Sequence, residues 1–148
     1  MIAVDTNILV YAHRTDSPFH ERAREVVEGL ASKPRPWAIP WPCAHEFFAV
    51  VTHPRIYRTP TPAETALDQL RALSALGNLA FIAEAEGYLS HLEAVAKAAK
   101  ARGGAVHDAR IAAICLSQGV EELWTADRDF SRYPALTVRN PLIGQLRA

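Results

Sequence analysis

The first ten residues constrain the fold of this 148-residue chain more than any other stretch. Ile2 to Val4 is a short apolar run with β-branched residues, which is typical of a buried strand. A second apolar run, Ile8 to Val10, follows after the polar residues Asp5, Thr6 and Asn7. In open α/β sheets, ligands bind beyond the carboxyl ends of the strands. Asp5 is therefore placed as a site residue, although Asp is also a favoured helix N-cap.

The bulk composition predicts one globular domain over residues 1–148, long enough for a substantial core. Hydrophobic residues make up 49% of the chain and charged residues 22%, which is ordinary for a globular protein. No apolar run approaches the length of a membrane span, and Met1 leads directly into the predicted first strand without a secretory signal. We therefore expect a cytoplasmic protein with no membrane association.

The net charge and the two cysteines exclude few classes of function by themselves. Sixteen basic residues balance sixteen acidic ones, so a nucleic-acid partner would need a local basic patch rather than a net positive charge. Cys43 and Cys115 lie in apolar surroundings and form no C-x-x-C pair, which favours two buried thiols over a disulfide.

Hydrophobic periodicity and turn signals predict strands that alternate with helices. The predicted strands are residues 2–4, 37–39, 79–82, 122–125 and 137–139, and the predicted helices are residues 8–13, 18–31, 42–52, 62–76, 84–102 and 105–118. Two of the helix starts depend on capping signals, which are Ser17 before Pro18 and the capping box from Thr61 to Glu64. The alternation indicates an α/β fold, with a central, mainly parallel sheet flanked by helices in an α/β/α sandwich.

Three further acids occupy unusual positions. Glu46 shares a helical face with Cys43, Phe47 and Val50, where an ionised carboxylate is costly unless it is paired or bound to a cation. The alternative is that Glu46 lies at the edge of that face and reaches water or an arginine. Asp108 opens a helix, where serving the helix dipole would be a sufficient role, and Asp127 follows a predicted strand.

These acids are expected to meet at one edge of the sheet. Strand C-termini and the following helix N-termini share an edge in a parallel α/β sheet, which brings Asp5, Asp108 and Asp127 together. Carboxylates 4 Å apart repel by about 4 kcal/mol per pair at an effective dielectric constant near 20. Such a cluster needs divalent cations or bound protons. Oxygen ligands suit Mg²⁺ or Mn²⁺ rather than zinc.

Other catalytic motifs are incomplete. His45 and Glu46 do not form a zincin motif, because position 49 is Ala rather than His. The sequence contains neither a G-x-x-x-x-G-K phosphate-binding loop nor a G-x-S-x-G nucleophile elbow. An Asp-x-Asp phosphatase would need an acid where Asn7 stands.

Four motifs in order resemble the PIN-domain nucleases, and in particular the VapC-type toxins of bacterial toxin–antitoxin pairs. The motifs are Asp5-Thr6-Asn7 after the first strand, the helical Glu46, His107-Asp108-Ala109 at a helix start, and Trp124 to Phe130 with Asp127 and Asp129. The resemblance extends from Ile2 to about Asn140. It implies a PIN-like fold and a Mg²⁺- or Mn²⁺-dependent endoribonuclease that acts on RNA and is restrained by a cognate VapB-type antitoxin. It also implies a homodimer.

The expected mechanism is metal-assisted hydrolysis of a phosphodiester bond. We expect Asp5 and Asp108 to hold the main ion, with Glu46 and Asp127 completing the site or holding a second ion. Supporting roles are assigned to Thr6, Asn7, Thr125 and Asp129, of which the first three are equally interpretable as turn residues. Candidate contacts to substrate phosphates are Arg14, Arg55, Arg58, Arg128 and Arg132, although solvated arginines are the commoner case.

Two alternative functions fit the same residues. One is a non-catalytic PIN-like domain that binds RNA or a protein, which would not need four mutually repelling carboxylates. The other is a DNA nuclease of related fold. An aromatic-rich region, Trp37, Trp41, Phe47 and Phe48, either fills the core or contributes to a partner surface.

Overall fold

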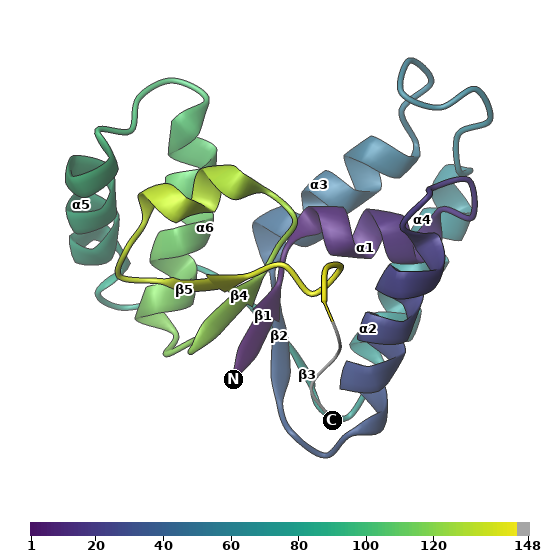
Figure 1. The fold of residues 1–148 in the computed structure, drawn as a ribbon, viewed down its shortest axis with the longest axis horizontal. Helices are drawn as coiled ribbons and strands as arrows, with labels where there is room; N and C mark the ends of the chain where they lie inside the picture. The colour runs from purple at the N-terminus through teal and green to yellow at the C-terminus, as the bar shows by residue number, and fades with distance from the viewer. Residues whose placement is uncertain (145–148) are drawn as a thin grey trace.

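The structure, a computed structural model, describes residues 1–144 of the chain. Within this range, five parallel strands form one sheet in the order β3-β2-β1-β4-β5 (Figure 1). The strands are β1 (Ile2–Val4), β2 (Trp37–Pro40), β3 (Leu79–Ile82), β4 (Glu122–Trp124) and β5 (Thr137–Arg139). All five predicted strands and their parallel arrangement are thereby confirmed.

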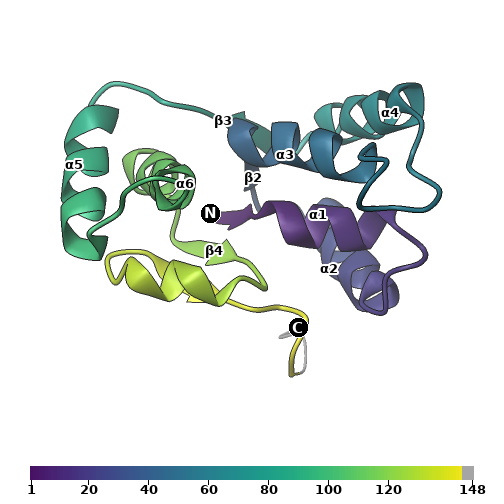
Figure 2. The same cartoon turned by 90° about the horizontal axis from the view of Figure 1, so that it is seen from above.

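The helices flank this sheet in two groups. In the part of the chain described, they are α1 (Thr6–His13), α2 (His20–Ser32), α3 (Trp41–Val51), α4 (Ala63–Ser74), α5 (Tyr88–Ala99), α6 (Ala105–Ser117) and a 3₁₀ helix, η1 (Arg128–Arg132). Helices α1 to α4 gather at one side of the molecule, whereas α5, α6 and η1 gather at the other (Figure 2). None of the helices within residues 1–144 has the length and apolar character needed to cross a membrane.

The core lies where the central strands meet α3 and α6. Val4, Ile39 and Leu123 on the sheet are fully buried, and Phe47 on α3 is only 1% exposed. Helix α6 buries a continuous run from Ile111 to Cys115. Strands covered on both faces need apolar residues on both, which explains the uninterrupted apolar runs in β1 and β2.

Strand register brings the first site residues together. Val4, the last residue of β1, is paired with Trp124, the last residue of β4. The next residues along, Asp5 and Thr125, therefore leave the sheet at the same level, and the Asp5 amide donates to the Trp124 carbonyl at 3.0 Å.

Several predicted helix starts differ from the structure. Helix α1 begins at Thr6 rather than Ile8, because the Asp5 side chain accepts from the Thr6 amide and caps the helix there. Helix α2 begins at His20 rather than Pro18, because the Ser17 hydroxyl accepts from the Phe19 amide at 3.1 Å and forms a turn. The capping box at Thr61 is absent, since Pro62 is the N-cap of α4 and forms no side-chain capping bond. Helix α5 begins at Tyr88 after a turn in which Gly87 has a positive φ of 83°.

Candidate active site

Asp5 caps α1 and lies in the candidate site. The residue is 4% exposed. Oδ1 accepts from the Thr6 amide at 2.8 Å and from the Cys43 thiol at 3.4 Å. Oδ2 accepts from the Thr125 hydroxyl at 2.7 Å and from Asn7 Nδ2 at 3.2 Å. Four donors therefore hold the carboxylate in one orientation and match its roughly four lone-pair sites, so a cation bound by Asp5 would displace or share one of these donors.

A second set of bonds ties α1 to the loop after β4. Asn7 Nδ2 also donates to Thr125 Oγ1 at 3.0 Å, and Asn7 Oδ1 accepts from the Ala126 amide at 3.0 Å. The same Thr125 hydroxyl accepts from the Asp127 amide at 3.0 Å. These contacts place the Asp127 backbone beside Asp5, so that Asn7 and Thr125 position two of the acids.

Asp108, Asp127 and Asp129 form a second group of acids. Each offers a carboxylate oxygen, and these oxygens lie within 4.8 Å of one another. Asp127 Oδ1 also accepts from the Asp129 amide at 2.9 Å and caps η1. Asp129, which the sequence suggested as an accessory acid, therefore lies close enough to act with the other two.

Glu46 reaches the site from α3, but the sequence placed it on the wrong part of the helix. The buried face of α3 consists of Cys43, Ala44, Phe47 and Val51, and Glu46 is exposed beside it. Thr6 Oγ1 donates to Glu46 Oε2 at 3.1 Å. Glu46 is thus at the edge of the apolar face, as the alternative interpretation held, and its carboxylate is directed to the site by Thr6.

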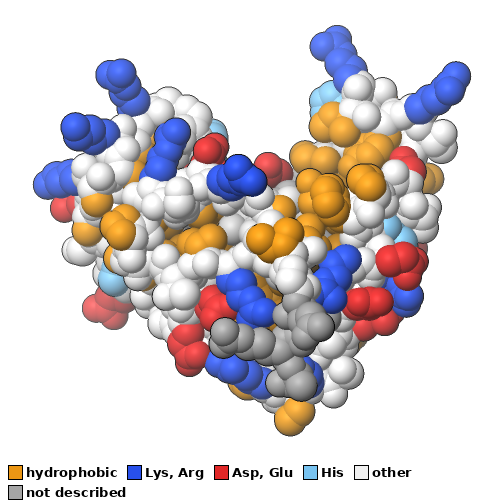
Figure 3. All heavy atoms as spheres, in the orientation of Figure 1, with side chains coloured by type: hydrophobic (Ala, Val, Ile, Leu, Met, Phe, Trp, Pro, Cys, Tyr) orange, Lys and Arg blue, Asp and Glu red, His pale blue; other side chains and the backbone are white. Residues whose placement is uncertain are grey.

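All four predicted principal acids line one cleft. Asp5, Glu46, Asp108 and Asp127 border a hollow of about 240 Å³ whose lining also includes Tyr11 and Tyr57. The molecular surface is deeply notched between its two groups of helices, and Lys and Arg side chains project from both rims of the notch (Figure 3). The two tyrosines and the Cys43 thiol are site features that the sequence did not single out. Cys43 lies on the apolar helical face three residues before Glu46, which is the signal that would have found it.

The electrostatics of the cleft fit a hard divalent cation. Burial, followed by repulsion from Asp127 and Asp5, raises the pKa of Asp108 from 3.8 to about 6. Burial also raises the pKa of Asp5, against the opposing effect of its hydrogen bond from Thr125. A cation among these oxygens would remove the repulsion, and the oxygen-only donor set matches Mg²⁺ or Mn²⁺.

The five candidate arginines occupy different settings. Arg14 is engaged within the protein, because its guanidinium forms two bonds to Asp16, at 2.9 and 2.6 Å, and stacks 3.9 Å from the Tyr57 ring centroid. It anchors the loop after α3 and has few donors left for a phosphate. The remaining candidates are exposed, and they are Arg55, Arg58, Arg128 and Arg132. A phosphate contact stays a prediction for these four.

The family follows from the sequence comparison. The sequence profile of the PIN domain matches residues 2–136. The chain belongs to the PIN-domain family. Among similar proteins, Ribonuclease VapC43 of Mycobacterium tuberculosis is 34% identical over 145 residues, which cover 98% of each chain. Ribonuclease VapC48 of the same species is 31% identical over 140 residues, covering 95% of this PIN domain and 97% of the relative.

Solved structures confirm the PIN-like fold. VapBC2 from Rickettsia felis, bound to a DNA fragment from its promoter, superimposes with a TM-score of 0.69 at 21% identity, covering 95% of this PIN domain and 98% of the other chain. VapC20 of M. tuberculosis, described as a Sarcin-Ricin loop cleaving toxin, gives a TM-score of 0.62 at 21% identity, with 88% and 93% covered. At 21% sequence identity, the similarity to these two structures establishes a common fold.

Proposed function

We propose that this PIN domain is a metal-dependent endoribonuclease that hydrolyses phosphodiester bonds in RNA. The observation that carries the proposal is the convergence of Asp5, Glu46, Asp108 and Asp127 on one cleft. The names of the VapC ribonucleases that resemble the chain over nearly its whole length support RNA as the substrate.

The chain's own residues prepare the site in two ways. Asp5 and Asp108 would hold Mg²⁺ or Mn²⁺, with Glu46 and Asp127 completing the coordination. Such an ion supplies an activated water and stabilises charge on the leaving oxygen. Thr6, Asn7 and Thr125 fix the orientation of the ligating carboxylates through the hydrogen bonds described above. Preorganised ligands reduce the cost of ordering the site during the reaction.

Asp5→Asn or Asp108→Asn should abolish cleavage and leave the fold intact, because each change removes one ligand charge and keeps the side-chain volume. The purified protein is incubated with structured RNA in Mg²⁺ or Mn²⁺, with EDTA as the metal-free control, and circular dichroism checks the fold. Metal-dependent cleavage retained by both variants would refute the assignment of the acids. Parallel reactions with single- and double-stranded DNA test for a DNA nuclease, and binding of RNA without cleavage would support a non-catalytic domain.

We further propose that the enzyme is the toxin of a type II toxin–antitoxin pair, acting in the cytoplasm as a homodimer of single-domain chains. The solved VapBC assemblies of the same fold support a small VapB-type antitoxin as the partner. Co-expression with the product of a short neighbouring reading frame should suppress the RNA cleavage. Light scattering that reports a monomer at micromolar concentration would contradict the dimer.

A further inference from the structure

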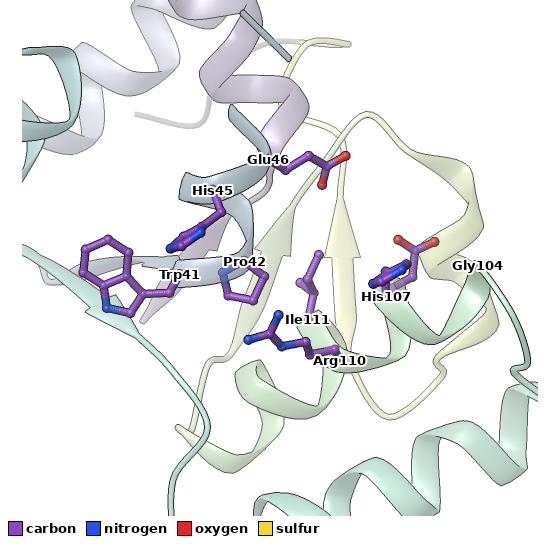
Figure 4. A pocket seen from close by; sticks show the side chains of 9 residues that line it. Trp41, Pro42, His45, Glu46, Gly104, His107, Arg110 and Ile111 are labelled. Carbon is purple, nitrogen blue, oxygen red and sulfur yellow. The ribbon is translucent and has the colours of Figure 1, made fainter. Parts of the chain in front are cut away.

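A second, larger hollow adjoins the acidic cleft. We call it the lateral pocket, and it is bordered by Trp41, His45 and Glu46 on α3 and by His107, Asp108 and Arg110 on α6. It measures about 570 Å³, within the usual range of small-molecule sites. Glu46 and Asp108 line both the lateral pocket and the acidic cleft, so the two hollows are neighbours that share part of their walls. Figure 4 shows Glu46 and His107 on facing sides, with Trp41 at the far end.

The Trp41 indole provides a rigid aromatic surface in this pocket. Its side chain is 43% exposed, whereas Trp37 is fully buried and Trp124 is 9% exposed. One face of the indole stacks on Phe81 of β3, with ring centroids 4.5 Å apart and an interplanar angle of 22°. His45 meets it edge-on at 6.2 Å. The ring is therefore held in place by Phe81 while much of its surface stays open to solvent.

The charges of the pocket favour a flat neutral group over a phosphate. Arg110 is paired with Glu84 through its Nε, so its charge is already balanced. Glu46 and Asp108, at the end nearest the acidic cleft, repel anions. His45 and His107 are exposed, and their ring nitrogens are a donor and an acceptor in the neutral form, which suits the edge of a nucleobase.

We propose that the lateral pocket binds the nucleobase of the nucleotide next to the scissile phosphate, with Trp41 stacking on the base and His45 and His107 contacting its edge. The inference rests on the proposed ribonuclease function. Five residues of helix separate Trp41 from Glu46, roughly 7.5 Å along the axis at 1.5 Å per residue, a span that a sugar and its base can cross. Unstacked bases in single-stranded RNA are recognised through aromatic stacking and edge contacts, so the pocket selects an unpaired nucleotide at the cleavage site.

Kinetics of Trp41→Ala test the proposal. Losing a base–aromatic stack should raise KM for a single-stranded RNA about 5- to 100-fold and leave kcat nearly unchanged, because stacking is uniform binding. Trp41→Phe keeps a ring and should show a smaller rise. Leu89→Ala on α5 is the matched control, since Leu89 is 65% exposed and lies outside the lining of the pocket. An unchanged KM and cleavage pattern in Trp41→Ala would overturn the proposal.

A binding measurement separates this inference from the proposed function. Nucleoside monophosphates contain no phosphodiester bond, so they are not substrates of the proposed reaction. In Mg²⁺ they should quench the fluorescence of the wild-type protein through Trp41, the most exposed of its three tryptophans. Trp41→Phe should lose that quenching. If the protein cleaves RNA but nucleotides do not quench its tryptophan fluorescence, the assignment of the lateral pocket is wrong and the ribonuclease proposal is supported. If quenching occurs without cleavage of any RNA, the ribonuclease proposal falls and the base site is supported.

Discussion

At the scale of single residues, the site depends on a small number of shared hydrogen bonds. The Thr125 hydroxyl donates to Asp5 and accepts from both Asn7 and the Asp127 amide. A buried hydroxyl with three partners links the acid after β1 to the acid after β4. These contacts fit the interpretation of Thr125 as a supporting residue, and that role stays a prediction.

Thr125→Val should damage both the site and the fold. It leaves the partly buried Asp127 amide without its acceptor and Asp5 without its shortest hydrogen bond, which we expect to cost about 1–3 kcal/mol of unfolding free energy. Loss of such an orienting partner typically lowers metal affinity by about 10- to 100-fold. Chemical denaturation and calorimetric titration with Mn²⁺ measure the two effects. Thr125→Ser keeps the hydroxyl and should behave almost as the wild type; equal losses in both variants would argue against the hydrogen-bond explanation.

Asp108 should make the metal-free protein less stable as the pH rises. Its pKa is 3.8 when unperturbed and about 6 in the fold, so between these values the folded state binds more protons than the unfolded state. Its contribution to stability is therefore complete below pH 3.8 and is lost as the pH rises through about 6.

Asp108→Asn tests this effect, because the amide has no charge to bury. In EDTA at pH 7.5 the variant should gain on the order of 1 kcal/mol after solvent screening, or roughly 2–4 °C in Tm. The gain should disappear near pH 4. Asp68→Asn on the exposed face of α4 serves as the control. If Asp108→Asn were less stable than the wild type at pH 7.5 without metal, burial and charge repulsion at Asp108 would not be destabilising as we infer.

At the scale of elements, the loop between α3 and α4 is held by two side chains at the end of α1. The His13 ring lies within hydrogen-bond distance of the Thr61 hydroxyl, at 3.1 Å, and Arg14, the C-cap of α1, makes the larger set of contacts. Arg14 donates to the Thr59 carbonyl at 2.9 Å and to the Thr61 hydroxyl at 3.2 Å, and it stacks on Tyr57. This loop carries Arg55 and Arg58, which are exposed. Arg14 therefore restricts the positions of Arg55 and Arg58, two candidate contacts to substrate phosphates at the rim of the acidic cleft.

Arg14→Ala should release this loop. We expect faster amide hydrogen exchange over residues 53–60 and a loss of about 1–2 kcal/mol in stability, because a cation–π contact and several hydrogen bonds are removed. Hydrogen exchange read by mass spectrometry locates the change. Arg24→Ala removes an exposed arginine with two ion pairs on α2 and should leave the loop unaffected. Unchanged exchange over residues 53–60 in Arg14→Ala would show that other contacts hold the loop.

At the scale of the whole molecule, the acids come from both groups of helices. Asp5 and Glu46 belong to the group of α1 and α3, whereas Asp108 and Asp127 belong to the side of α6 and η1. A cation in the cleft therefore joins the two sides and should stabilise the fold as a unit, since it binds only where both are in place.

Manganese should raise the melting temperature of the wild-type protein. At a concentration 100 times the dissociation constant, binding to the folded state adds about 2.7 kcal/mol to the unfolding free energy. Asp5→Asn should show little of this rise in melting temperature. The variant therefore distinguishes Mn²⁺ bound in the acidic cleft from Mn²⁺ bound weakly elsewhere on the surface. Thermal melting with and without millimolar Mn²⁺ measures the effect, and an equal shift in both proteins would place the ion elsewhere.

The sequence by itself determined the sheet and predicted which acids would gather in one cleft. Strands β3 and β5 match their predicted bounds, because short apolar runs between turn residues are local signals. Asp5, Asp108 and Asp127 were identified because each adjoins the end of a strand or the start of a helix, where parallel topology directs residues to one edge.

Only the tertiary structure decided how the side chains around those acids are used. Glu46 is exposed and accepts a hydrogen bond from Thr6, Arg14 is bonded to the loop between α3 and α4, and Trp41 is partly exposed and stacks on Phe81. Each outcome depends on contacts between residues about 40 or more positions apart. Helical periodicity assigns a face only to within a residue, so the packing of α3 against α1 and β3 fixed what the sequence left open.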